Sequence, residues 1–455
     1  MTGRHDGATR ARFALLLGSL LALVPLRLSA AELDSPATTC MGAERAGSDA
    51  GVAAYTGRYL GTWPGQTHPY GYEPGPYAAE APLFEVNAGN QAQHADALTA
   101  GQKALLRQYP AAFRMKVYPS HRDFRFADWV CEAVKHNATE ARVINDGRGI
   151  AGVSGAIPFP FPKDGLQAIW NAINPHRGWT ESVVTDIADV YADGAIAWGK
   201  QRFKTLDPGK DPTRRGSYQD TVGAYFMAHY LLPARDRGLV AVGYQPNDFS
   251  RQSTQSTWLY QPWIRRVRQS APVGFDYPVP PAGLRTVDED YGYNGSPERY
   301  EWKLVGRREM LVPYHNFRVN DPAVRYADLV KPSTLNPEYL RYERHRVWVI
   351  EGRLKPGMRH IYSRREFYVD EDSWLVLWAD NYDARGSLWR TSFITYFYSQ
   401  ESSTFHRGVS VYHDLQQHAY EATYLVNEAG EGWWRLNQPL TPEMFSAEAA
   451  ARAGR

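Results

Sequence analysis

The stretch HRVWVIEGRLKPGMRHIYSRREFYVDEDSWLVLWADNYD, residues 345–383, decides the fold class of this chain. It contains three runs rich in valine, isoleucine and aromatic residues, and the turn VDEDSW (residues 369–374) joins the last two. Such runs are typical of β-strands. Strands this close in sequence must pair antiparallel, because a parallel pair needs a long crossover. The stretch therefore predicts part of an antiparallel meander.

The same pattern, with a turn every 8 to 14 residues, continues on both sides from Asp186 onward. Further strands are predicted in residues 223–233, 238–245, 256–262, 299–314 and 388–399. Within NGSPERYEWKLVGRREMLVPYHNFRV (residues 294–319) we expect a strand, a tight turn at the basic residues and a second strand. Alternation of side chains along the first strand places Tyr300 and Trp302 on one face and Glu301 on the other.

Apolar side chains occupy both faces of several of these strands. In SWLVLWAD, Trp374, Val376 and Trp378 alternate with Leu375 and Leu377. A sheet with one solvated face would alternate apolar with polar residues instead. Both faces must therefore be covered, or one must line an apolar cavity.

Helices to cover the sheet are few. The stretches 99–110, with Thr99 as N-cap, and 162–173 are predicted helices, and 126–143 suggests another. A mainly β fold with a few helices (α+β) follows, in which a strongly curved antiparallel meander forms a half-barrel or open barrel around an apolar cavity, with helices as lid. A filled core without a cavity is the alternative.

The N-terminus has the features of a secretory signal peptide. Arg4, Arg10 and Arg12 precede the apolar run 13–26, and small residues follow it. This run is too short to span a bilayer comfortably, so cleavage near Ala30 or Ala31 and export of the mature chain are expected, with a retained anchor as the alternative. We divide the chain into a signal peptide (1–31), an extended Gly/Pro/Tyr-rich arm (32–98) and the half-barrel domain (99–455).

Charge and cysteine content fit an exported protein without a nucleic-acid partner. Without residues 1–31 the chain has 47 Lys and Arg against 48 Asp and Glu, so no global field attracts nucleic acid. Its two cysteines, Cys40 and Cys131, are candidates for a disulfide in an oxidising compartment, with two unpaired buried thiols as the alternative.

No catalytic or metal-binding pattern stands out, so no enzyme, cofactor or metal is predicted. The sequence GVSGA (152–156) departs by one residue from the Gly-x-Ser-x-Gly elbow and does not open a predicted helix. The acidic run DEDYGYNG (288–295) places glycine where a calcium loop needs a ligand, which favours a turn before the strand at Tyr300. Asp370, Glu371 and Asp372 are assigned to a hairpin turn.

Four ordered blocks carry a resemblance to a known family: residues 155–171, 258–272, 294–314 and 342–390. Together they resemble an exported Gram-negative family of unknown function, described as outer-membrane lipoprotein-sorting-like and similar to the periplasmic lipoprotein carriers. The resemblance implies a half-barrel closed by helices with an apolar interior that accepts acyl chains. It also implies a working context beside an inner-membrane exporter or an outer-membrane barrel, and it supplies no catalytic residues.

We therefore expect a periplasmic carrier or binding protein for a lipid, a lipoprotein or another hydrophobic molecule, with transient membrane contact. A hydrolase or isomerase that uses the same cavity is the alternative, and convergent titratable groups in the cavity would favour it. The candidate cavity residues are Trp258, Tyr260, Tyr300, Trp302, Trp348, Ile350, Trp374, Trp378 and Tyr396. The candidate residues for the cavity mouth or a docking surface are Arg265, Arg266, Arg268, Arg364 and Arg365.

Overall fold

The structure is a computed structural model, and it describes residues 30–58, 71–214, 222–250, 256–270, 274–280, 282–399 and 403–455. The predicted signal peptide lies, except for its last two residues, outside this part of the chain. Within the described ranges, no helix is long and apolar enough to cross a membrane.

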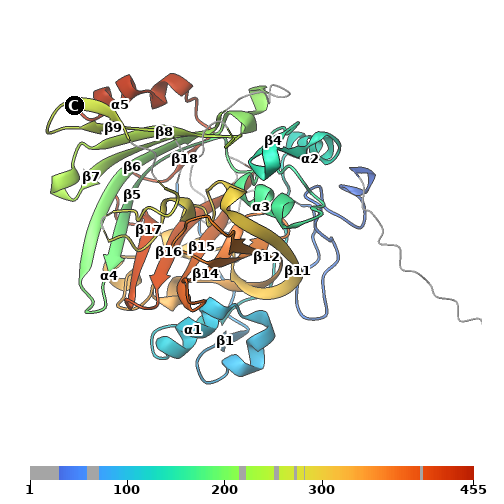
Figure 1. The fold of residues 1–455 in the computed structure, drawn as a ribbon. Coiled ribbons are helices and arrows are strands. Elements are labelled where there is room, and N and C mark those ends of the chain that lie inside the picture. The colour runs from blue at the N-terminus through green and yellow to red at the C-terminus, as the bar shows by residue number, and fades with distance from the viewer. Residues whose placement is uncertain are drawn as a thin grey trace, which may run out of the picture.

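One large sheet dominates the molecule, and it consists of two meanders (Figure 1). The first comprises β11 (Tyr300–Pro313), β12 (Tyr342–Leu354), β13 (Arg364–Asp370), β14 (Val376–Tyr382), β15 (Leu388–Ser399), β16 (Thr404–Asp414) and β17 (Ala419–Leu425). The second comprises β5 (Thr180–Val190), β6 (Ile196–Leu206), β7 (Val222–Leu232), β8 (Val240–Pro246), β9 (Ser256–Gln261) and β10 (Arg266–Gln269). Strands β17 and β5 pair antiparallel and join the two meanders. The last strand of the first meander thus lies beside the first strand of the second meander, although the second meander comes earlier in the sequence.

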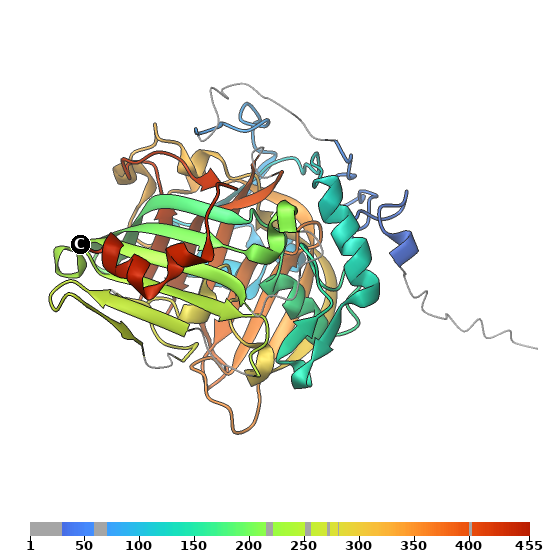
Figure 2. The same cartoon turned by 90° about the horizontal axis from the view of Figure 1, so that it is seen from above.

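The sheet curves strongly and does not close, which confirms the predicted open half-barrel (Figures 1 and 2). Short strands extend it: β1 (Phe84–Val86) pairs with β2 (Met115–Val117), β2 bridges to β12, and β18 (Arg435–Leu436) pairs with β5. A separate hairpin consists of β3 (Arg142–Ile144) and β4 (Gly149–Ala151).

The predicted helices are present. They are α1 (Ala100–Gln108), α2 (Asp128–Glu140) and α3 (Gly165–Ile173), and two short helices, α4 (Tyr326–Leu329) and α5 (Ala447–Ala453), were not predicted. Thr99 caps α1 in a reciprocal capping box with Gln102. In Figure 1, α1 lies below the β14–β15 part of the sheet and α3 lies on its opposite side. Gly101 approaches Asp380 and Thr391, and Gly165 approaches the backbone of β11, so both helices contact the sheet closely.

The stretch 294–319 does not contain the predicted turn between two strands. β11 runs unbroken through it, and a β-bulge between Leu304 and Gly306 replaces the turn. Gly306 has a φ of 137°, which favours glycine, and the bulge bends the strand without reversing it. The predicted faces are confirmed, because Tyr300 is buried and Glu301 is exposed.

The first meander is a filled core. Every residue of β14, β16 and β17 is buried, so both faces of these strands are covered. Trp378 packs in parallel on Phe393 at 5.2 Å, and Trp374 packs on Trp348 at 5.9 Å. This part of the molecule therefore follows the filled-core alternative.

The N-terminal segment is attached by a disulfide. Cys40 and Cys131 are bonded with their Cα atoms 5.1 Å apart, which confirms the predicted pair. Cys131 lies on α2, so the bridge holds the irregular segment around Cys40 against this helix. The closed loop is long, and the chain-entropy argument assigns such a bridge a stabilisation of about 3–5 kcal/mol.

Candidate ligand-binding cavity

A cavity of about 200 Å³ lies on the concave face of the second meander. Its wall is formed by β6, β7 and β8, and its floor by residues around Arg177, by β5 and by the segment Val279–Asn294. The volume lies below the roughly 300–1,000 Å³ of most small-molecule sites. It suits a small ligand or one end of a larger one.

The wall of the cavity is largely apolar. Its apolar positions are Phe203, Ala224, Phe226, Ala228, Tyr230 and Ala241, and Gln201, Thr205 and Gln245 add polar groups. These side chains alternate with residues that face the other side of the sheet, as the two-residue period of a strand requires. Because alanines occupy three of the six positions, the wall leaves open space that larger side chains would fill.

Arg177 is the cation of the cavity floor with the fewest hydrogen bonds. Its guanidinium lies 3.8 Å from the centre of the Tyr291 ring and 3.6 Å from an oxygen of Asp207. Lys210 binds the same Asp207 oxygen more closely, at 2.7 Å. Among the described residues the Arg177 guanidinium makes no hydrogen bond, although it is about four-fifths buried. Its N–H donors are therefore available for an anionic group of a ligand.

Glu181, Asp290 and Arg285 continue the polar floor. The Tyr291 hydroxyl donates to Glu181 at 2.8 Å, and Arg407 binds Asp290 at 2.8 Å. Burial raises the pKa of Asp290, but the neighbouring Arg407 and Arg285 outweigh it and hold that pKa below its ordinary value. The other oxygen of Glu181, Oε1, is buried without a hydrogen-bond partner among the described residues. It is an acceptor for a ligand donor or for water.

His406 completes the floor as a neutral imidazole. Burial lowers its pKa far below the ordinary value, and the charges of Arg407 and Arg177 lower it further. Its Nε2 atom has no hydrogen-bond partner within the described part of the chain. Arg177, Glu181 and His406 thus give the floor one donor group, one acceptor and one neutral ring.

The cavity residues predicted from the sequence do not line this cavity. Trp258 and Tyr260 pack in the cluster under α5, on the other face of the second meander, so the prediction for β9 chose the wrong face. The other candidates lie among the packed residues of the first meander: Tyr300, Ile350, Trp374, Trp378 and Tyr396 are buried, and Trp302 and Trp348 are half-buried. Apolar residues on both faces of a strand predicted correctly that these residues are buried. They did not predict whether a face would be covered by helices and loops or would line a cavity.

The predicted mouth and docking arginines fall into two groups. Arg265, Arg266 and Arg268 are exposed at the β9–β10 hairpin, where Trp263 is also 60 % exposed. Arg364 is half-buried and binds Glu366, and it lies over the Tyr382 ring. The prediction of Arg365 as a mouth residue is wrong, because this side chain is fully buried and forms an ion pair with Asp288 at 2.7 Å.

The acidic run 288–295 has a structural role that its sequence did not reveal. It forms the predicted turn before β11, but its carboxylates point into the core. Asp288 binds Arg365, Asp290 binds Arg407, and Glu289 accepts from the Tyr362 hydroxyl at 3.0 Å. The segment thereby places Tyr291 and Asp290 at the cavity floor.

The sequence did not predict Arg177, Glu181 and His406 as site residues, because no local motif marks them.

A curved, open and mainly antiparallel half-barrel with a partly charged hollow under one meander defines the class of this protein. The model of a family described as "Protein of unknown function (DUF1329)" matches residues 85–451. An uncharacterized protein of Pseudomonas aeruginosa is 36% identical over 408 residues, which cover 87% of each chain. The chain belongs to the DUF1329 family.

Three solved structures are similar to part of this chain. A DUF1329 family protein from Desulfovibrio piger is 15% identical, with a TM-score of 0.41 and coverage of 60% of this chain and 92% of that one. A putative outer membrane lipoprotein-sorting protein domain from Vibrio parahaemolyticus is 14% identical, with a TM-score of 0.41 and coverage of 61% and 93%. A LolA superfamily protein from Nitrosomonas europaea is 11% identical, with a TM-score of 0.38 and coverage of 63% and 100%.

Proposed function

We propose that this protein is an exported carrier that binds an amphipathic, lipid-like molecule in the cavity of the second meander without transforming it. The observation that carries this proposal is the division of the cavity into a largely apolar wall and a floor with the cation Arg177, whose hydrogen-bond donors are unused among the described residues. An anionic head group would accept hydrogen bonds from the Arg177 guanidinium. The first carbons of an apolar chain would then contact Phe203 and Phe226 on the wall.

The size of the cavity sets the binding mode. A volume of about 200 Å³ holds a head group and a short part of a chain. The rest of a long acyl chain would extend through the mouth. Each buried methylene contributes about 0.8 kcal/mol, so even a short buried part gives useful affinity.

The disulfide supports export, because such bonds persist in oxidising compartments such as the periplasm. The β9–β10 hairpin supports transient membrane contact. It exposes Trp263 and Ile264 beside Arg265 and Arg266, a combination that suits the interface of an anionic bilayer.

A fluorescent fatty acid tests the proposal, with its uncharged methyl ester as the matched ligand. We expect the acid to bind with a Kd of about 1 μM or below, and the ester about tenfold more weakly. Arg177→Gln should weaken binding of the acid about 10–100-fold, since a charge-assisted hydrogen bond contributes about 1.5–3 kcal/mol. Arg202→Gln, on the opposite face of β6, is the control and should change nothing. Equal binding of acid and ester, or no binding of either, would refute the head-group assignment.

The enzymatic alternative has one observation in its favour, the presence of Glu181 and His406 in the same cavity. His406 lacks the hydrogen-bonded orienting partner that a general base normally has, within the described residues. Turnover of an ester that is abolished by His406→Gln would establish the enzyme and overturn the carrier.

A further inference from the structure

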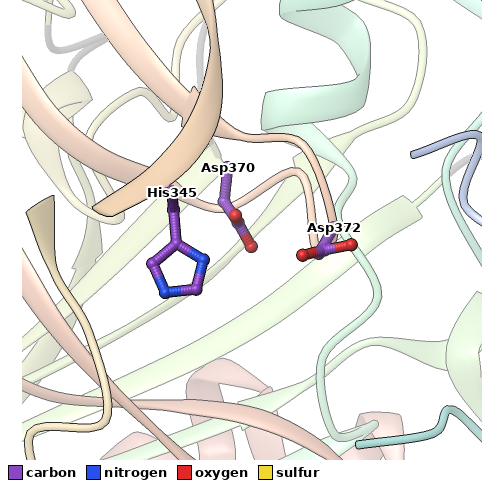
Figure 3. Close-up of side chains that lie close together, drawn as sticks. All are labelled: His345, Asp370 and Asp372. Carbon is purple, nitrogen blue, oxygen red and sulfur yellow. The ribbon is translucent and has the colours of Figure 1, made fainter. Parts of the chain in front are cut away.

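Three buried side chains meet at the end of the β13–β14 hairpin, away from the cavity. His345 comes from β12, Asp370 ends β13, and Asp372 lies in the turn that follows (Figure 3). One ligand atom from each lies within 4.8 Å of the others. All three residues are at least 97 % buried, and none of them lines the cavity.

Two of these side chains have an unused polar atom. His345 Nδ1 and Asp370 Oδ1 are buried and have no hydrogen-bond partner among the described residues. Buried polar atoms are nearly always paired with protein, water or an ion, so each of these atoms needs a partner. Both belong to the same small cluster, and one bound species could serve both.

The surroundings of His345 leave the lone pair of its Nδ1 atom available to a ligand. Its Nε2 lies 3.1 Å from Glu343 Oε2, and this carboxylate holds the ring proton on Nε2. The Tyr314 ring stacks on the imidazole at 3.7 Å and fixes its plane. A histidine that donates one ring nitrogen to a carboxylate while the other faces a metal is the usual arrangement in metal sites.

The two aspartates are likewise held by outer partners. Asp370 accepts through Oδ2 from the Tyr314 hydroxyl at 3.1 Å and from the Ser373 amide at 3.0 Å, which leaves Oδ1 unused. Asp372 accepts from Arg122 through both oxygens at 2.7 Å. Each carboxylate oxygen has two lone pairs, so Asp372 keeps an acceptor position on each oxygen.

The arrangement of charges indicates that a cation would be favourable at this position. Two buried carboxylates, Asp370 and Asp372, lie together, and of these two Arg122 donates to Asp372. A divalent ion would compensate the charge of Asp370.

We propose that His345 Nδ1, Asp370 Oδ1 and an oxygen of Asp372 bind one divalent transition-metal ion, for which Zn²⁺ is the natural probe. Nitrogen and carboxylate ligands suit Zn²⁺, with bonds of about 2.0–2.2 Å. The ion would join β12 to the β13–β14 turn. Through Asp372 and Arg122 it would also stabilise the N-terminal segment, because Arg122 donates to the carbonyl oxygens of Glu44 and Ala53.

The test is the binding of Zn²⁺ to the full chain after chelator treatment and dialysis. We expect calorimetry to find one equivalent with a Kd of about 1 μM or below, and elemental analysis to find one zinc per chain. Zn²⁺ should also raise the melting temperature. Co²⁺ should give visible absorption bands of a nitrogen–oxygen site.

His345→Gln and Asp370→Asn should each weaken Zn²⁺ binding at least tenfold and remove the thermal shift. Asp380→Asn is the matched control, since Asp380 is equally buried but accepts from Gly101, Thr391 and Trp378. If a variant does not fold by circular dichroism, Asp372→Asn replaces it. Absence of a bound equivalent in the wild type would overturn the proposal. Unchanged binding in the folded variants would overturn it as well, because the zinc would then occupy a different site.

Discussion

Both meanders of the sheet contain strands with many apolar residues, but these strands are buried to different extents. In the first, β14, β16 and β17 are buried at every position, while in the second β7 has only two buried residues, Met227 and Ala228. The first meander contacts α1 on one side, and α3 and the acidic segment 288–295 contribute to the packing on the concave side. The second has α5 on its outer face and the cavity on its inner face. Covering elements, rather than strand composition, decide which meander is filled.

The largest expected contrast is in large-to-small substitutions. Trp378→Ala in the filled meander should lower the free energy of unfolding by about 3–5 kcal/mol, because the fully buried ring leaves a cavity. Phe226→Ala on the half-buried cavity wall should cost about 1 kcal/mol. Chemical denaturation measures both. Similar losses would mean that the second meander is as tightly packed as the first.

The opposite substitution sharpens the comparison. Ala379→Phe in the filled meander should cost about 1–3 kcal/mol, because no space receives the ring. Ala241→Phe should cost less than about 1 kcal/mol and weaken fatty-acid binding, because the ring would enter the cavity. Denaturation and probe titration of the same samples check this prediction. It fails if Ala241→Phe destabilises as strongly as Ala379→Phe.

The junction of the meanders should respond to pH. Asp189 on β5 lies opposite Glu421 on β17. Burial, and after it the charge of Glu421, raise the pKa of Asp189 to about 8. The folded state therefore keeps a proton that the unfolded chain releases near pH 4, and this contribution to stability is lost as pH rises toward about 8.

Asp189→Asn removes this proton linkage. The variant should be more stable than the wild type at about pH 8, by roughly 1–2 kcal/mol, and the difference should shrink toward pH 5. Denaturation at both pH values measures it. Asp193→Asn, in the exposed β5–β6 turn, is the control and should show no such trend. A constant difference across pH would show that Asp189 does not hold the proton.

The smallest expected effect concerns the edge of the second meander. Replacing Arg265 and Arg266 together by Glu should leave fatty-acid binding unchanged and slow transfer to anionic vesicles about 3–10-fold, because the hairpin would lose its attraction to the surface. High salt should remove the difference. The matched control is a double change to Glu at Arg308 and Arg385, which are exposed on the first meander. Equal slowing in both double variants would exclude a specific docking hairpin.

Local sequence signals were enough to predict most of the helices and strands. Thr99 as N-cap predicted the start of α1, and the alternating pattern of residues 300–304 predicted which side of β11 is buried. The bulge at Gly306 was not predicted, because basic residues beside a glycine also suit a turn. The Cys40–Cys131 pair was predicted because only two cysteines exist.

The candidate site could not be predicted in the same way. Arg177 follows α3, Glu181 lies on β5, and His406 lies on β16, and only the pairing of β17 with β5 brings these elements together. The metal candidate also depends on pairing, because β12 and β13 pair and place His345 near the turn that contains Asp370 and Asp372.

The sequence by itself determined the mainly β class, the antiparallel meanders and the helix starts, because these depend on periodicity, turn residues and caps within a few residues. Only the tertiary structure decided which apolar face meets a helix, a buried acidic segment or open space. Trp378 and Phe226 both come from apolar strands, yet one lies in a filled core and the other on a cavity wall. The physical reason is that burial depends on what covers a strand, and the covering elements come from distant parts of the chain.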